Sequence, residues 1–374
     1  MIPKGWKEQR VGDALVIENT KRKPLSAEER ATMQGPFPYY GPTQIQDWIN
    51  EYAYDGRYAL IGEDGDHFLK YKTQSMTQII DGHFNVNNHA HAIQGTDSCT
   101  TDWFYFYFQN RSVESYLTRQ GAKRYKLTKA SLEDIPIILP PMNEQRRIIE
   151  ILSTWDRAIE MVEALIANAR TQKQALMQSL LTGKKRLPGF SGDWRSEKLG
   201  SLCQITKGEQ LGRLAMLDDG TVPVINGGVT PSGFTDRSNN PGGCITISEG
   251  GNSCGFVSLM SRPFWCGGHC YALKQLTVDR SFLFASLKHR EPEIMTLRVG
   301  SGLPNIQKKA LAGFELLVAP RPEQEAIGKL ADLQDREICG LEGQSAALRQ
   351  EKSALMQQLL TGKRRVKITE KEHA

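Results

Sequence analysis

The sequence has few of the features that mark secreted, membrane-spanning or zinc-binding proteins. Its seven cysteines are an odd number scattered through 374 residues, and no two of them form a Cys-x-x-Cys pair. No apolar run is long enough to cross a membrane, and the chain does not begin with a signal-peptide pattern. We therefore expect a cytoplasmic protein with reduced thiols and no metal site.

Motifs of common enzyme classes are also missing. We find no Gly-x-Gly-x-x-Gly, His-Glu-x-x-His or Asn-Pro-Pro-aromatic pattern. Leu181–Lys185 resembles the end of a phosphate-binding loop, but Gln178 stands where that loop requires glycine and Lys185 where it requires Ser or Thr. The acids Glu63, Asp64 and Glu249 lie beside glycines at predicted strand ends, which favours turn and capping roles. We predict no catalytic residue in this chain.

A segment of 43 residues occurs twice. Residues 144–186 and 323–365 align without a gap at an offset of 179, with 20 identities. Apolar residues recur every three or four positions in both copies, which is typical of a long amphipathic helix. In the first copy Asn143 is the expected N-cap and Gly183 the expected C-cap. The second copy contains two glycines, Gly340 and Gly343, and should be the weaker helix.

Each predicted helix has one apolar stripe that must be buried. The other copy is the simplest partner, so we predict that the two helices pair as an antiparallel coiled coil. An alternative is that each helix packs on its own globular domain as ordinary core. The predicted seam contains Trp155, Ile159, Val162, Ile338 and Leu341.

The segments that precede the helices also match one another. Gly5–Gly12 aligns with Asp193–Gly200 at an offset of 188, and Phe84–His89 aligns with Phe264–His269 at 180. A drifting offset is what small loop insertions would leave, so the chain reads as one globular-plus-helix unit written twice. Because the helices match better than the globular halves, we interpret the helices as a common spacer between two diverged heads.

Short apolar runs bounded by glycine indicate a mixed α/β architecture for each half, of the α+β class. Tyr58–Ile61 and Cys244–Ile247 are predicted strands. Asp102–Phe108 could be a strand or a buried helix, and its counterpart Ser281–Leu287 favours a helix.

Two histidines, His89 and His269, occupy the same place in the two halves. Since a residue shared by both heads is poorly suited to reading two different targets, we favour a structural histidine in each domain core. The group Cys254, Cys266, His269 and Cys270 is a weak zinc candidate, because the first half keeps only His89 of that set.

Over nearly its whole length the chain resembles the specificity (S) subunit of type I restriction–modification enzymes. The order of the motifs, repeated in both halves, carries the resemblance more than any one of them. The motifs are Gly5-Trp6, Tyr39–Gly41, Ile45–Asp47, Leu60–Gly65, Ile245–Gly251, Pro263–Trp265, His269–Tyr271, Gly300–Asn305, the Glu144-Gln145 and Glu323-Gln324 junctions after proline, and the repeated Leu-Leu-Thr-Gly-Lys.

The resemblance implies two pseudo-twofold-related target recognition domains, residues 1–142 and 187–320. Two spacer helices, residues 143–186 and 321–365, would set the unread gap in an asymmetric bipartite DNA site, and residues 366–374 form a basic or polar tail. It further implies docking of two methyltransferase (M) subunits, and of a restriction (R) subunit in some systems. The chain would not be catalytic itself, because S-adenosylmethionine, ATP and Mg²⁺ belong to those partner subunits.

A net charge of +5 is compatible with such DNA binding but does not establish it. We expect loop residues to contact bases and phosphates. The candidates are Lys21, Arg22, Lys23, Lys70, Lys72, Lys123 and Arg124 in the first half, and Lys207, Arg213, Arg237, Asn239, Lys308 and Lys309 in the second. Two other classes stay open: a nuclease with an unrecognised site, and a scaffold that gathers proteins without reading DNA.

Overall fold

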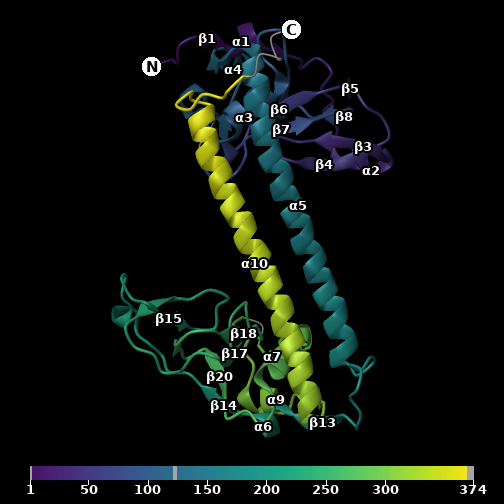
Figure 1. Ribbon diagram of the computed structural model, residues 1–374, viewed down its shortest axis with the longest axis vertical. Helices are drawn as coiled ribbons and strands as arrows, with labels where there is room; N and C mark the ends of the chain where they lie inside the picture. The colour runs from purple at the N-terminus through teal and green to yellow at the C-terminus, as the bar shows by residue number, and fades with distance from the viewer. Residues whose placement is uncertain (1, 121–123, 301, 369–374) are drawn as a thin grey trace. The chain divides into compact units, whose positions relative to one another are not determined.

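The computed structural model describes residues 2–120, 124–300 and 302–368 of the chain. The chain divides into two compact units, and each unit holds one globular half together with part of both long helices (Figure 1). Unit 1 comprises Met1–Met161 and Ser345–Ala374, and unit 2 comprises Val162–Gln344. The division therefore crosses the helices, whereas the domain boundaries suggested by the sequence fall at the helix ends.

The long helices are α5 (Met142–Leu181) and α10 (Arg321–Leu359). Helix α5 begins at Met142. The prediction that Asn143 is the N-cap is therefore wrong, because Asn143 already lies inside the helix. After each helix comes a glycine with positive φ, Gly183 at 69° and Gly362 at 67°, a conformation that suits glycine because it lacks a Cβ. Helix α10 runs through Gly340 and Gly343 without a break.

The strands of unit 1 are short and build three sheets. They are β1 (Lys7–Arg10), β2 (Val16–Ile17), β3 (Gln34–Tyr40), β4 (Ile45–Ile49), β5 (Tyr54–Asp55), β6 (Tyr58–Gly62), β7 (Thr77–Ile80), β8 (His83–Val86), β9 (Ala90–Gln94) and β12 (Pro136–Leu139), with a separate hairpin of β10 (Thr118–Gln120) and β11 (Arg124–Lys126). The sheet orders are β1-β12, β2-β9-β6-β7 and β4-β3-β8-β5, and β3 runs parallel to β8.

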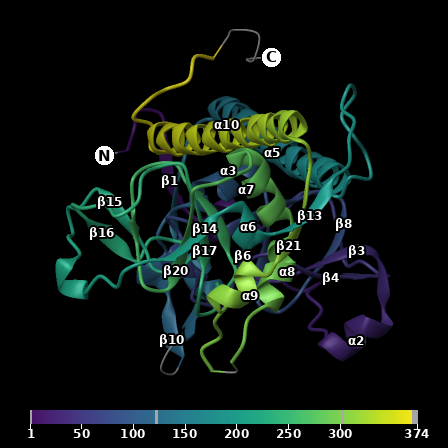
Figure 2. The same ribbon diagram turned by 90° about the horizontal axis from the view of Figure 1, so that it is seen from below.

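Unit 2 repeats this topology. Its strands are β13 (Arg195–Lys198), β14 (Gln204–Lys207), β15 (Val222–Ile225), β16 (Gly233–Thr235), β17 (Cys244–Ser248), β18 (Val257–Met260), β19 (Trp265–Cys266), β20 (Cys270–Lys274) and β21 (Glu315–Val318). The orders β13-β21 and β14-β20-β17-β18 match those of unit 1, and β16-β15-β19 matches β4-β3-β8 without a counterpart of β5. Strand β15 runs parallel to β19. Figure 2 labels β14, β17 and β20 of one sheet and β15 and β16 of another. The internal repeat read from the sequence is thus a repeat of fold.

Short helices complete each globular half. In unit 1 they are α1 (Val11–Ala14), α2 (Ala27–Thr32), α3 (Thr101–Gln109), α4 (Lys129–Glu133) and the 3-10 turns η1 (His67–Lys70) and η2 (Glu114–Tyr116). In unit 2 they are α6 (Leu199–Leu202), α7 (Arg280–His289), α8 (Glu291–Thr296), α9 (Lys308–Ala312) and η3 (Arg213–Ala215). The predicted strands over 58–61 and 244–247 are confirmed as β6 and β17. The segment left open between strand and helix is α3, and α7 is its counterpart.

The long helices belong to the cores of both units. In unit 1, Ile148 and Leu152 of α5 and Met356 and Leu359 of α10 pack in one apolar cluster with Trp103 of α3. In unit 2, helix α5 contributes Met177, Leu180 and Leu181, helix α10 contributes Ile327 and Ala331, and Phe282 comes from α7. Each helix end is therefore held by the domain beside it, as well as by the other helix.

A buried carboxylate joins the end of α5 to the start of α10 in unit 2. Glu323 is fully buried, and Arg186 donates to both of its oxygens at 2.6 Å. Trp194 Nε1 donates to the same carboxylate at 3.0 Å, and the Arg186 guanidinium lies 5.7 Å from the Trp194 ring. Because Arg186 follows α5 and Glu323 opens α10, the two helices run antiparallel in this unit.

Unit 1 contains the same joint made from the other copy. Arg365 donates to both oxygens of the buried Glu144 at 2.6 and 2.7 Å, and Trp6 Nε1 donates at 3.0 Å. The glutamine after each glutamate is also matched. The Nε2 groups of Gln145 and Gln324 donate to the carbonyls of Pro140 and Ala319, which holds the preceding strand end against the helix start.

Further ion pairs join the helices inside each unit. Lys173 pairs with Asp335 in unit 2, and the equivalent residues Lys352 and Asp156 pair in unit 1 at 2.5 Å. Of the predicted seam residues, Ile159 and Val162 are buried, whereas Trp155, Ile338 and Leu341 are half-buried. A seam running along the whole pair of helices stays a prediction.

The contact among Arg186, Glu323 and Trp194 should contribute to the stability of the chain. Replacing Arg186 with alanine leaves the buried Glu323 carboxylate with only the Trp194 donor, which should lower the free energy of unfolding by about 2–3 kcal/mol. Arg186→Lys should recover only part of this, because an ammonium cannot bond both oxygens in parallel. Urea unfolding of the full chain measures it. Lys185→Ala, at the exposed neighbouring position, is the control, and an equal loss in that variant would contradict the role of the joint.

Candidate nucleic-acid interface

A glutamate follows an inner strand of a four-stranded sheet in each unit, Glu63 after β6 and Glu249 after β17. The backbone around the two glutamates is the same. The Glu63 N–H donates to the His89 carbonyl at 2.7 Å, and the Glu63 carbonyl accepts from Leu127 N–H at 2.8 Å. Glu249 makes the equivalent bonds with His269 at 2.9 Å and Ile306 at 2.8 Å. The loops that meet at Glu63 in unit 1 and at Glu249 in unit 2 are therefore structurally equivalent.

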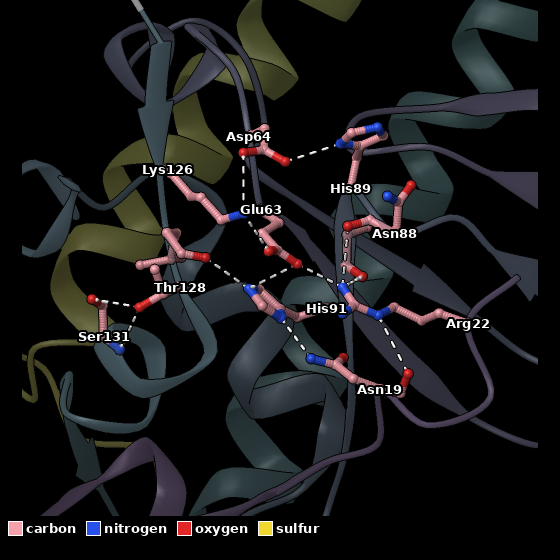
Figure 3. Close-up of polar contacts among 12 residues, drawn as sticks. Asn19, Arg22, Glu63, Asp64, Asn88, His89, His91, Lys126, Thr128 and Ser131 are labelled. Carbon is pink, nitrogen blue, oxygen red and sulfur yellow. Dashed lines mark hydrogen bonds and ion pairs between the residues drawn. The ribbon is translucent and has the colours of Figure 1, made fainter. Parts of the chain in front are cut away.

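In unit 1 the Glu63 carboxylate lies between two cations (Figure 3). Arg22 Nη1 donates to Oε2 at 2.6 Å, and Lys126 Nζ lies 3.1 Å from Oε1. Burial alone would raise the pKa of Glu63, but the bonds from Arg22 and Lys126 outweigh it, so the pKa lies below its usual value. Arg22 also donates to the carbonyls of Asn88 and Ala90. Its guanidinium therefore ties three loops together.

Beneath this pair lies His91, which is fully buried on β9. Its Nε2 lies 2.8 Å from the Leu127 carbonyl, and its Nδ1 lies 2.8 Å from Asn19 Nδ2. This arrangement fits a neutral ring that donates from Nε2 and accepts at Nδ1. Burial lowers the pKa of His91 below 6.5, which also favours the neutral form.

Unit 2 builds the same network from different side chains. Tyr271 replaces His91, and its hydroxyl lies within bonding distance of both the Ile306 carbonyl (3.0 Å) and Glu249 Oε1 (3.2 Å). Lys207 pairs with Glu249 as Arg22 pairs with Glu63, and its Nζ donates to Glu249 Oε1 at 2.5 Å. Burial raises the pKa of Tyr271 to about 12, so this inner position is neutral here as well.

The two equivalent histidines lie at the surface of these networks. The side chains of His89 and His269 are 51% and 61% exposed, so our interpretation of them as core residues is wrong. His89 Nδ1 lies 2.9 Å from Asp64 Oδ2, and His269 Nδ1 lies 3.7 Å from Glu249 Oε2. The sequence alignment placed the pair correctly, but only the loop geometry brings them to the surface.

Most of the basic candidates of unit 1 already have acidic or aromatic neighbours. Besides Arg22 on Glu63, Lys23 pairs with Glu51 and Lys70 with Asp66, while Lys21 and Lys72 lie 5.9 Å from the rings of Tyr54 and Tyr71. Lys123 lies outside the described residues. Arg124 begins β11, and its side chain is also outside the described part. Direct DNA contact by these residues stays a prediction.

The candidates of unit 2 differ more in their surroundings. Lys207 bonds Glu249, and Arg237 lies between Asp236 and the ring of Trp265. Both ends of the Asn239 amide are engaged, since Nδ2 donates to the Cys266 carbonyl at 3.0 Å and Oδ1 accepts from Cys266 N–H at 2.6 Å. Arg213, Lys308 and Lys309 are exposed. The structure thus gives Asn239 a role in holding its loop.

The network residues Lys126, His91 and Tyr271 were missed as site residues. The available signal was the repeat alignment, which places His91 opposite Tyr271 two residues after the matched histidines. Within the described residues, no group of three or more His, Cys, Asp or Glu side chains could hold a metal ion. No described helix is long and apolar enough to cross a membrane.

Comparison with known proteins gives one consistent result. A family model described as "Type I restriction modification DNA specificity domain" matches residues 3–169 and 191–345. The chain is similar to a putative type I restriction enzyme specificity subunit of Haemophilus influenzae, with 36% identity over 39% of this chain and 36% of that protein. It is 32% identical to a putative type I specificity subunit of Mycoplasma pneumoniae over 42% of this chain and 43% of that one.

Matches over the full length are weaker in sequence. The specificity subunit of the type I restriction enzyme MjaVIII of Methanocaldococcus jannaschii is 22% identical over 98% of this chain and 94% of its own length. Among solved structures, the S subunit of a type I restriction–modification system from M. genitalium aligns with a TM-score of 0.74 at 17% identity. That alignment covers 99% of this chain and 100% of the solved one, which shows a shared fold.

The inner residues of the network predict different responses of the two units to acid. His91 and His67 of unit 1 both have pKa values lowered by burial, so the unfolded chain binds more protons than the folded one below about pH 6.5. Unit 1 should therefore keep this stability above pH 6.5 and lose it as the pH falls toward the lowered values. Tyr271 of unit 2 does not titrate in that range.

Hydrogen–deuterium exchange at pH 7.5 and 5.5, corrected for intrinsic rates, measures this difference. Peptides of β6 and β9 should lose protection relative to those of β17 and β20. His91→Gln, which is neutral at both pH values, should reduce the difference. Equal loosening of the two units on acidification would contradict the prediction.

Proposed function

The chain belongs to the family of type I restriction–modification DNA specificity subunits, and from this premise we propose that each globular half reads one half of a bipartite DNA site. The observation that carries the proposal is that two heads of one topology present different side chains from equivalent loops. Asp64 and Lys126 bridge the loops of unit 1, and Gly250 and Asn305 form the equivalent bridge in unit 2. Common backbone with different side chains suits two readers of different sequences.

We propose that the paired helices are the spacer that sets the unread gap. In each unit the end of one helix is joined to the start of the other by the Arg–Glu–Trp contact described above. Neither helix can then slide along the other without breaking a bond to a buried carboxylate. Two readers joined at one separation favour DNA sites of one spacing over all others.

The helices also carry large apolar side chains in water. Met161 and Leu165 of α5 are 68% and 52% exposed, and Leu333 of α10 is 50% exposed. Exposed apolar side chains on long helices are common where another protein packs. We propose that methyltransferase subunits dock on the helices, and that any restriction subunit joins through them.

On this proposal the chemistry belongs to the partner chains. S-adenosylmethionine, ATP and Mg²⁺ would be bound by the methyltransferase and restriction subunits, and this chain would supply the sequence specificity. The cytoplasmic location stays a prediction.

Mapping of methylated adenines in the host genome, with and without this chain, tests the proposed function. We expect one asymmetric bipartite motif that disappears when the chain is deleted. The purified complex with the methyltransferase subunit should bind a duplex carrying that motif more tightly than a scrambled one. An unchanged methylation pattern after deletion would contradict the proposal, as would cleavage of DNA by the isolated chain with Mg²⁺.

The joints at both helix ends specify how the spacer should be lengthened. Seven residues inserted after Met161 in α5 and seven after Gln344 in α10 keep the heptad phase and leave every joint intact. The rise of about 10 Å should lengthen the unread gap by about three base pairs, while both half-sites stay the same.

Methylation mapping of this double insertion measures the gap directly. Insertion into α5 alone is the matched control, because it forces one joint to break and should weaken methylation without defining a new gap. Changed half-sites with an unchanged gap would contradict the division between heads and spacer.

A further inference from the structure

His89 and His269 are held in the same way at the same place on two heads that otherwise differ. Each ring has its Nδ1 toward a carboxylate, Asp64 in unit 1 and Glu249 in unit 2 (Figure 3 for unit 1). Each backbone N–H is fixed by an asparagine: Asn87 Oδ1 accepts from His89 at 2.8 Å and Asn226 Oδ1 accepts from His269 at 3.2 Å. Within the described residues, Nε2 of neither ring has a hydrogen-bond partner.

The charges around each histidine cancel without it. In unit 1, Glu63 and Asp64 are matched by Arg22 and Lys126, and the neutral His91 lies beneath them. In unit 2, Glu249 is matched by Lys207, and the neutral Tyr271 lies beneath. If His89 or His269 carries a proton, the cluster around it therefore has a net charge of one positive unit. That charge lies on an exposed ring at the edge of the loops.

The Glu249 carboxylate supplies an independent observation. Its Oε2 is buried and has no hydrogen-bond partner among the described residues, whereas Oε1 accepts from Lys207 and lies 3.2 Å from the Tyr271 hydroxyl. An unpaired buried carboxylate oxygen is costly. His269 Nδ1 lies 3.7 Å from this oxygen, and a shift of less than about 1 Å would bring it to normal hydrogen-bond length. Protonated His269 would satisfy this oxygen and present Nε2–H to solvent.

We infer that His89 and His269 each donate from Nε2 to a backbone phosphate of the bound DNA, one in each half-site. The inference rests on the proposed function. Phosphate is favoured over a base edge because the histidine is common to both heads, whereas the neighbouring bridge differs, Asp64–Lys126 in one and Gly250–Asn305 in the other. A contact shared by readers of different sequences carries no sequence information, and phosphate contacts are of that kind.

The carboxylate behind each ring orients it for this contact. With Nδ1 toward Asp64 or Glu249, Nε2 lies on the opposite side of the ring. An imidazolium donates from both nitrogens, so one ring can bond the carboxylate and a phosphate at the same time.

The test uses the complex of the full chain with its methyltransferase subunit, and duplexes with and without the mapped motif. His89→Gln and His269→Gln should each weaken binding of both duplexes by the same factor, about 3–10-fold, and lower the salt slope of log affinity by about one unit. His89→Lys should restore the salt slope, because a lysine ammonium can pair with the same phosphate.

His83→Gln is the matched control. His83 is also an exposed histidine of unit 1 with a carboxylate nearby, Asp55 at 3.3 Å, but it stacks on Tyr52 and its counterpart in unit 2 is not a histidine. Its replacement should change neither affinity nor salt slope.

Two results would overturn the inference: glutamine variants that bind with the wild-type affinity and slope, or a loss confined to the cognate duplex, which would mean that the ring reads a base. Failure of the proposed function is distinguishable, because the wild-type complex would then not discriminate between the two duplexes.

Discussion

A buried carboxylate at the start of each long helix is the interaction on which the fold depends. Glu144 and Glu323 are fully buried, and a charge so placed is tolerated only with partners that stay in position. Those partners are an arginine that follows the other helix and a tryptophan that precedes the first strand of the globular half. One carboxylate therefore fixes the direction of the second helix and the attachment of the head at once.

The ion pair also explains why both copies of the repeated segment end in a glycine turn followed by an arginine. The glycine of Leu-Leu-Thr-Gly-Lys takes positive φ and turns the chain out of the helix, and three residues later the arginine reaches the glutamate. The helix end, the glycine turn and the ion pair occur together in both units. Because these residues join the helices and do not contact a target sequence on our proposal, they can stay alike while the heads diverge.

The heads diverge mainly in the side chains around corresponding strands. The glutamate after the inner strand bonds the same two backbone positions in each unit, but its cation is Arg22 in one and Lys207 in the other, and its inner partner is His91 or Tyr271. A buried histidine kept neutral and a tyrosine can each bond the same carbonyl, which is why such different residues occupy one position. The surface above them is where the two halves present different chemistry.

The sequence by itself determined the duplication, the two long helices, the strands β6 and β17 and the family, since periodicity, turn residues and motif order are local and need no knowledge of distant contacts. Only the tertiary structure decided which basic side chains are already paired, that Asn239 holds its loop, and that His89 and His269 are exposed. The reason is that these properties depend on residues far apart in the chain: Arg22 meets Glu63, Asn239 meets Cys266, and Arg365 meets Glu144. A cluster of lysines looks the same in sequence whether or not folding brings a carboxylate to it.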